Sequence, residues 1–113
     1  MEIKEHQIGD ILIVQLQERR LDAARAPGFR EEMVRRIDSG SHRIVLDLET
    51  VEFVDSSGLG ALVSCLKRLG PAGSLAIAGA NKTVARLFSL TRMDRVFALH
   101  ESVDAAVKQL SSA

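Results

Sequence analysis

The sequence is poor in the residues that bind metals, form disulfides or stack on nucleic-acid bases. Among its 113 residues it has one cysteine, two prolines, four phenylalanines and neither tryptophan nor tyrosine. The one cysteine, Cys65, excludes an internal disulfide and a cysteine-based zinc cluster. Because Cys65 falls in an apolar helical stretch, we predict a buried thiol that packs as a small hydrophobic side chain. With so few aromatic side chains, the core must consist mainly of Val, Ile, Leu and Ala. The scarcity also weakens the case for single-stranded nucleic-acid binding, which uses aromatic stacking platforms.

Excess charge is also lacking, since 15 basic residues balance 15 acidic ones. A chain without net positive charge has no field that attracts phosphate backbones or anionic lipids, so we expect no direct nucleic-acid partner and no membrane partner. Apolar runs fall short of the about 20 residues that span a bilayer, and the first residues do not resemble a signal peptide. We therefore expect a cytoplasmic protein. Two local groups of arginine are interpreted as solvated faces: Arg19, Arg20 and Arg25, and Arg92 and Arg95.

What the sequence does have is an alternation of strand-like and helix-like segments. Branched and apolar residues predict strands at 2–7, 11–17, 44–48, 74–78 and 95–99. Helical spacing predicts helices at 22–38, at 59–69, around 84–88 with Asn81 as cap, and after Ser102. Gly9-Asp10 suits the tight turn of an opening antiparallel hairpin, and the later strands should run parallel through right-handed crossovers. The fold class is therefore α/β, with packed helices and a mixed sheet in one domain over residues 1–113.

Candidate chemistry lies in residues 51–60, between the strand at 44–48 and the helix at 59–69. Ser56 and Ser57 follow Asp55 at the expected amino terminus of that helix. Free backbone N–H groups and the helix dipole favour an anion there, so a phosphoryl group on a serine would find hydrogen-bond donors. Asp and Ser are also the preferred capping residues, and Gly58 allows a tight entry into the helix. Local chemistry alone leaves both interpretations open.

The wider sequence resembles a known family. The stretch 51–60, which reads Val-Glu-Phe-Val-Asp-Ser-Ser-Gly-Leu-Gly, resembles the signature of STAS domains, in particular of bacterial anti-sigma-factor antagonists. The strand at 44–48, the helix at 62–69 and segments 73–78, 84–88 and 93–97 also match the run of that family. The resemblance extends from Met1 to about Leu110. It implies a STAS-like single domain at 1–113.

The resemblance implies a regulatory role for Ser56. In that family the serine directly after the aspartate accepts a phosphoryl group from a partner anti-sigma factor serine kinase, and a serine phosphatase removes it. The unphosphorylated protein binds the kinase and releases its sigma factor. Leu21-Asp22 matches a family pair that places an acid near the phosphoserine. Residues 17–20, Gln-Glu-Arg-Arg, lack the glycine that is common there, so this loop departs from the family pattern.

The resulting hypothesis is a non-catalytic, phosphorylation-controlled anti-sigma-factor antagonist that needs no cofactor and is a monomer or weak dimer. Leu59 also fits the apolar stripe of its helix, which favours core packing for this residue. The residues expected to contact the partner are Asp22, Asp55, Ser57, Gly58 and Leu59.

Other chemistries find little support in the residues. A serine hydrolase would need Gly-x-Ser-x-Gly and an activating histidine, but Ser56 lacks those glycines, and His6, His42 and His100 lie at the margins of elements. Histidine and carboxylate residues show no metal spacing, and no third glycine completes a phosphate-binding Gly-x-Gly-x-x-Gly. Two alternatives stay open. One is a STAS signalling or scaffold module with a non-sigma output, such as stress or biofilm control. The other is a nucleotide-binding protein or small enzyme.

Overall fold

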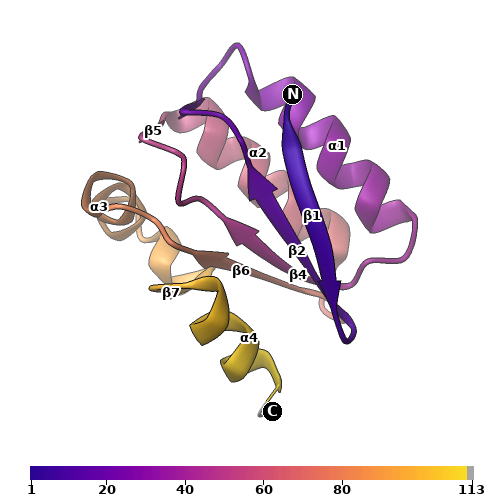
Figure 1. Cartoon of the computed structure of the whole chain (residues 1–113). Helices are drawn as coiled ribbons and strands as arrows, with labels where there is room; N and C mark the ends of the chain where they lie inside the picture. Colours follow the sequence, from indigo (N-terminus) through magenta and orange to yellow (C-terminus); the bar gives the residue numbers. More distant parts are fainter. Residues whose placement is uncertain (112–113) are drawn as a thin grey trace.

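The computed structural model describes residues 1–111 and shows a mixed five-stranded sheet with helices on both faces (Figure 1). The sheet has the order β1-β2-β4-β6-β7, with β1 at Ile3–Ile8, β2 at Ile11–Leu16, β4 at Arg43–Asp47, β6 at Ser74–Ala78 and β7 at Ala98–His100. A separate two-stranded sheet pairs β3, Arg20–Leu21, with β5, Phe53–Val54. The helices are α1 at Ala26–Asp38, α2 at Ser56–Leu69, α3 at Lys82–Leu90 and α4 at Val103–Ser111, with a 3-10 helix, η1, at Met93–Arg95.

The strand directions confirm the predicted fold class. β1 and β2 are antiparallel and meet at the pair Ile8 and Ile11, so Gly9 and Asp10 form the turn, and Gly9 has a φ of +60°. The pairs β2–β4, β4–β6 and β6–β7 are all parallel. β2 is buried on both faces, as its unbroken apolar run predicts.

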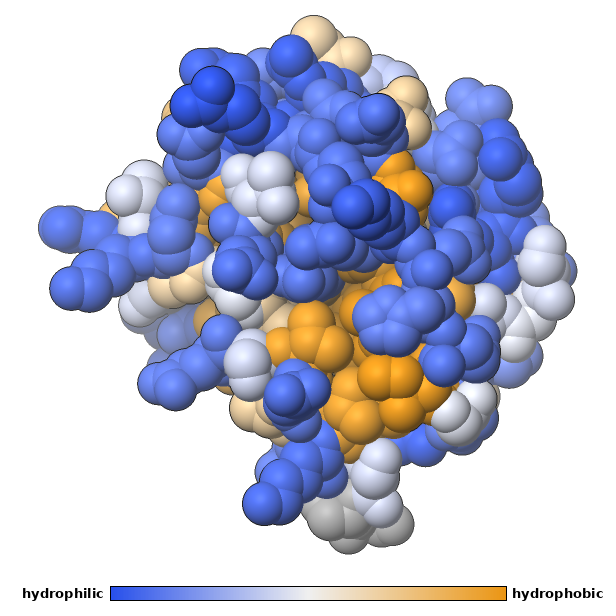
Figure 2. Space-filling view, in the orientation of Figure 1, coloured by the Kyte–Doolittle hydropathy of each residue, from blue (hydrophilic) through white to orange (hydrophobic). Residues whose placement is uncertain are grey.

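Side-chain alternation along β2 divides the core into two layers. Leu12 and Val14 belong to the larger cluster, which also contains the buried faces of α1, α2 and α3. Ile11 and Ile13 belong to a smaller cluster that α4 closes with Ala106. In Figure 1, α1 and α2 accordingly lie behind the sheet and α4 lies in front of it. Figure 2, in the same orientation, shows apolar residues reaching the surface of this face amid polar ones.

Several local predictions are confirmed. The side chain of Asn81 caps α3 by accepting a hydrogen bond of 2.8 Å from the Val84 amide, and Ser102 caps α4 through the Ala105 amide at 3.1 Å. Cys65 is fully buried, and desolvation raises the pKa of its thiol to about 11.

Within residues 1–111, no helix combines the length and the apolar character needed to cross a membrane.

Two predicted elements start in the wrong place. The helix expected from residue 22 begins at Ala26, because residues 22–25 form a turn in which the Asp22 carbonyl accepts from the amides of Arg25 and Ala26. Pro27 suits this start, since it has no N–H to donate in the first helical turn. The strand expected at 95–99 is instead η1 followed by β7, with a left-handed Arg92 at φ 61° turning the chain into η1.

Candidate functional site

The small β3–β5 sheet brings together two acids that are far apart in the sequence. Its strands are parallel, with Leu21 opposite Val54, so the residues that follow them, Asp22 and Asp55, leave the same edge. The Asp55 amide donates to the Leu21 carbonyl at 3.2 Å. The predicted site residues from 22 and from 55–59 are therefore neighbours in the fold.

Asp55 is the cap of α2. Its Oδ1 accepts a hydrogen bond of 3.0 Å from the Gly58 amide, and its backbone is extended, as is usual for a capping residue. Its Oδ2 accepts a second bond of 3.2 Å from the Ala23 amide. The carboxylate thus satisfies one free amide of the helix and also holds the segment after β3 against it.

Ser56 does not cap α2. It is the first residue of α2, its side chain is exposed, and its hydroxyl forms no hydrogen bond within residues 1–111. Ser57 is exposed as well and lines a groove of about 640 Å³ between α1 and α2, together with Ala23, Pro27 and Ser64. The two serines therefore present different surroundings to a partner.

Close packing explains why position 58 is a glycine and why Leu59 is buried. A Cβ added to Gly58 would lie 2.3 Å from the Leu21 carbonyl oxygen and 2.9 Å from Cγ1 of Val54, so α2 can approach the small sheet this closely only with glycine. Leu59 is 8% exposed and belongs to the core cluster. Neither residue offers much side-chain surface to a partner, and partner contact at these positions stays a prediction.

Asp22 is held by two arginines. Its carboxylate accepts from the Arg25 amide at 3.3 Å, from Nη1 of Arg25 at 3.2 Å and from Nε of Arg20 at 3.3 Å. Desolvation raises the pKa of Asp22, but the hydrogen bonds from Arg25 and Arg20 and the charge of Arg25 outweigh it, so the pKa lies below its usual value. Asp22 therefore carries its negative charge within a local ion-pair network.

Arg19, Arg20 and Arg25 have solvent-exposed side chains, as their interpretation as a solvated face expects, and they also take part in ion pairs. Arg19 pairs with Glu52 and Arg25 pairs with Glu18. The guanidinium of Arg20 also lies 4.7 Å from the ring centroid of Phe53, a cation–π contact. The segment 17–20, which departs from the family pattern, is thus tied by ion pairs to the residues that directly precede β5 and α1. No sequence pattern signals them, because partners such as Arg19 and Glu52 are 33 residues apart.

The family relationship rests on both the sequence and this geometry. The sequence pattern of the STAS domain matches residues 2–106. The chain belongs to the STAS domain family. Relatives of this STAS protein include the anti-sigma-B factor antagonist of Staphylococcus epidermidis, which is 31% identical over 85 residues, or 74% of this chain and 79% of that protein. The resemblance to anti-sigma-factor antagonists seen in the sequence is confirmed.

Solved structures agree with this relationship. A crystal structure of a candidate anti-sigma factor antagonist from Thermotoga maritima has a TM-score of 0.86 at 27% identity, covering 95% of this STAS protein and 92% of the other chain. The Bacillus protein SpoIIAA has TM-scores of 0.74 unphosphorylated and 0.72 phosphorylated, at 17% and 18% identity. These alignments cover 99% and 96% of this chain and 100% and 99% of the SpoIIAA chains. At such low identity the likeness to SpoIIAA shows the shared fold alone.

Proposed function

We propose that residues 1–113 form one STAS domain that acts as an anti-sigma-factor antagonist, controlled by phosphorylation of Ser56. The observation that carries the proposal is that Asp55, and not Ser56, caps α2. Asp55 caps α2, so the Ser56 hydroxyl is exposed and free of hydrogen bonds within residues 1–111. A phosphoacceptor must be accessible in this way, whereas a capping serine would be occupied by the helix.

The modification is an ordinary phosphoryl transfer. Oγ of Ser56 attacks the γ-phosphorus of ATP held by the partner kinase, the new O–P bond forms as the bond to ADP breaks, and a base of the kinase accepts the hydroxyl proton. A serine phosphatase removes the group by hydrolysis: water attacks the phosphorus, the Oγ–P bond breaks, and the Ser56 hydroxyl and inorganic phosphate are released. This chain supplies only the hydroxyl and its position, so it acts without a cofactor and is not itself an enzyme.

The phosphoryl group controls binding through its charge. It adds about 1.5 to 2 negative charges at pH 7 at the start of α2, beside Asp55. The helix end stabilises this charge by about 0.3 to 1 kcal/mol. A like charge brought against the partner interface costs several kcal/mol. The interface penalty is the larger effect, so the phosphorylated protein stays folded and releases the kinase.

The proposed partner surface contains Asp22, Asp55 and Ser57 around the phosphoacceptor. Within this surface, Arg20 and Arg25 offset the negative charge of Asp22. Phosphorylation of Ser56 is therefore the event that changes the charge of the surface. The partners are an anti-sigma factor serine kinase and a serine phosphatase, and their control of transcription places the protein in the cytoplasm. We further propose that it is a monomer or weak dimer when free.

The test is phosphorylation by defined kinases. Each anti-sigma serine kinase encoded in the same genome is incubated with the protein and ATP, and the product is mapped by mass spectrometry. The proposal expects one phosphoryl group on Ser56, none in the Ser56→Ala variant, and normal modification of the Ser57→Ala variant. Modification confined to Ser57 or Thr50 would refute the site. Capture of the unphosphorylated protein by a kinase that holds no sigma factor would instead favour a non-sigma output.

A further inference from the structure

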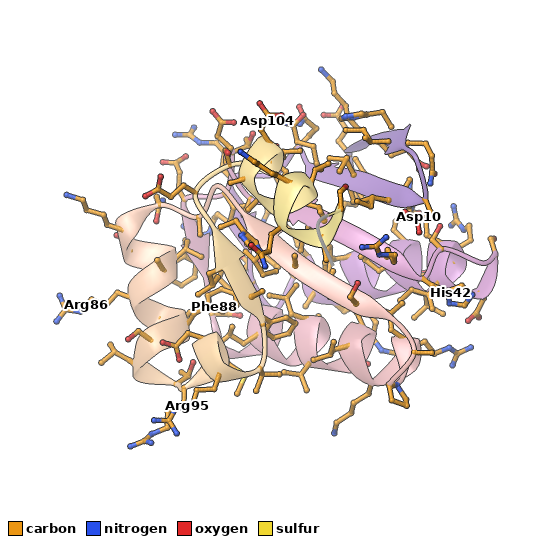
Figure 3. The ribbon with its side chains drawn as sticks, turned by 90° about the horizontal axis from the view of Figure 1, so that it is seen from below. Asp10, His42, Arg86, Phe88, Arg95 and Asp104 are labelled. Carbon is orange, nitrogen blue, oxygen red and sulfur yellow. The ribbon has the colours of Figure 1, made fainter. Side chains whose placement is uncertain are left out.

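The segment from α3 to η1 carries three arginines that have no acidic partner within residues 1–111. Within residues 1–111, every arginine before α3 donates a side-chain hydrogen bond or forms an ion pair. Arg86, Arg92 and Arg95 form neither there, although all three are exposed. Figure 3 shows Arg86 of α3 and Arg95 of η1 extending away from the body, whereas Phe88 of α3 points inward. The sole acid of segment 82–95 is Asp94.

An apolar groove lies beside Arg86. It has a volume of about 260 Å³ between β5 and α3 and is lined mainly by Phe53, Val54, Val84, Leu87 and Leu90, with the Arg86 side chain at its wall. Leu90 is 72% exposed and Phe53 is 38% exposed, so large apolar side chains reach solvent here without a covering element. The groove is thus apolar in its lining and basic at its border.

The lining of the groove adjoins the phosphoacceptor segment in the chain. Val54, which lines it, directly precedes the cap Asp55 and the phosphoacceptor Ser56. Phe53 has Arg20 on its ring, and Arg20 in turn is bonded to Asp22. Pairwise contacts therefore link Asp22 through Arg20 and Phe53 to the groove beside α3.

The positive charges of Lys82 and Arg86 do not stabilise α3. Lys82 is the first residue of the helix, where the positive end of the dipole disfavours a cation. Neither Lys82 nor Arg86 has an acid within α3 to pair with. Both cations therefore stay available to a partner.

We propose that this groove docks an acidic, amphipathic segment of the kinase that phosphorylates Ser56. Apolar side chains of that segment fill the space between Phe53 and Leu90, and its carboxylates pair with Lys82 and Arg86. Charge complementarity selects this occupant, because Arg86 borders the apolar groove and Lys82 lies one turn before it on α3. The inference rests on the proposed function, since it assigns the kinase a second contact beyond Ser56.

The test uses the full chain and the kinase that modifies it in the experiment on Ser56. Arg86→Glu reverses a border charge, Leu90→Ala removes an exposed side chain from the groove, and Lys108→Glu makes the same charge change on α4 across the sheet as a matched control. Lys108 is exposed and forms no ion pair within residues 1–111. Thermal unfolding should be the same for all variants, because the altered side chains lie at the surface.

Arg86→Glu should raise the kinase Kd and the KM for phosphorylation about tenfold and make binding less sensitive to salt. Leu90→Ala should raise both about three- to tenfold, which corresponds to the loss of a partly buried apolar contact. The kcat should be unchanged for each variant, since Ser56 and its cap are intact. Lys108→Glu should behave as the unmodified protein does.

Three results would overturn the inference, and they differ in what else they affect. Normal phosphorylation of Ser56 with an unchanged KM in both α3 variants refutes the groove alone. Failure of every kinase to modify Ser56 removes the proposed function and the docking inference together. Binding of a labelled DNA duplex that Arg86→Glu abolishes, with kinase affinity unchanged, would assign the cations to nucleic acid instead.

Discussion

The Ala23 amide donates a hydrogen bond of 3.2 Å to Oδ2 of Asp55, joining the segment after β3 to the residue that caps α2. A second contact reinforces this link, because the Asp55 amide donates to the Leu21 carbonyl at 3.2 Å. The two acids of the proposed interface therefore keep a fixed relation to each other and to Ser56. A surface held in this way is prepared for binding before the partner arrives, which lowers the ordering cost of association.

Asp55→Ala should destabilise the protein much more than Ser56→Ala. Loss of the cap costs about 0.5 to 2 kcal/mol, and loss of the bond from Ala23 about 0.5 to 1.5 kcal/mol more. Ser56→Ala should change the free energy of unfolding by less than about 0.5 kcal/mol, since Ser56 is exposed and caps nothing. Urea denaturation of the two variants measures both. A larger loss of unfolding free energy for Ser56→Ala than for Asp55→Ala would mean that Ser56 is the residue that caps α2.

Gly58→Ala and Gly60→Ala should have opposite effects on stability. A Cβ at Gly58 would lie 2.3 Å from a backbone oxygen of Leu21, whereas one at Gly60 would meet nothing within 4 Å. The first variant should lose about 1 to 3 kcal/mol by overpacking. The second should gain about 0.5 to 1 kcal/mol, because alanine is the better helix former. Thermal unfolding measured in parallel checks the contrast, and similar melting temperatures would show that α2 can shift away from β3.

The sequence was sufficient for the regular part of this fold. The apolar run of β2, the turn at Gly9 and the cap at Asn81 each have a local signal, and each is found in the structure. The strands β3 and β5 have two residues each, too short for a periodic pattern, so their pairing could not be predicted. That pairing is what brings Asp22 to Asp55.

The candidate site, too, was predicted from the sequence only in part. The order Asp-Ser-Ser-Gly indicates a helix start, but both Asp55 and Ser56 suit a cap, and only the hydrogen bond to the Gly58 amide assigns the role. The basic groups looked alike in the sequence. The structure gives Arg25 two acidic partners and leaves Arg95 with none within residues 1–111, because pairing depends on contacts between distant segments.

Acidification should weaken the fold partly through Asp22. Hydrogen bonds from two arginines hold the pKa of Asp22 below its unfolded value of about 4, despite the opposing desolvation. The unfolded state therefore binds the proton more readily, so this contribution is present above pH 4 and is lost as pH falls below it. Urea melts between pH 6 and pH 2.5 should show a shallower fall in stability for Asp22→Asn than for the unmodified protein.

The matched control for this pH series is Asp94→Asn. Asp94 is exposed and forms no ion pair within residues 1–111, so its removal should leave the pH dependence of stability as it is. The same curve for the Asp22→Asn variant and the unmodified protein would mean that the bonds from Arg20 and Arg25 contribute nothing in solution, as is found for many exposed ion pairs.

Substitutions at Ser56 separate control of binding from stability of the helix. Ser56→Asp should keep the fold and gain up to about 1 kcal/mol from the dipole of α2, because the new charge lies at its amino terminus. In a binding assay with the kinase, Ser56→Ala should keep full affinity, and Ser56→Asp should lose about 2 to 3 kcal/mol, a 30- to 150-fold weaker Kd. Ser57→Asp adds the same charge on the neighbouring residue that lines the α1–α2 groove, and a smaller loss there would locate the effect at Ser56. Equal affinity for Ser56→Ala, Ser56→Asp and the phosphorylated protein would refute charge-controlled release.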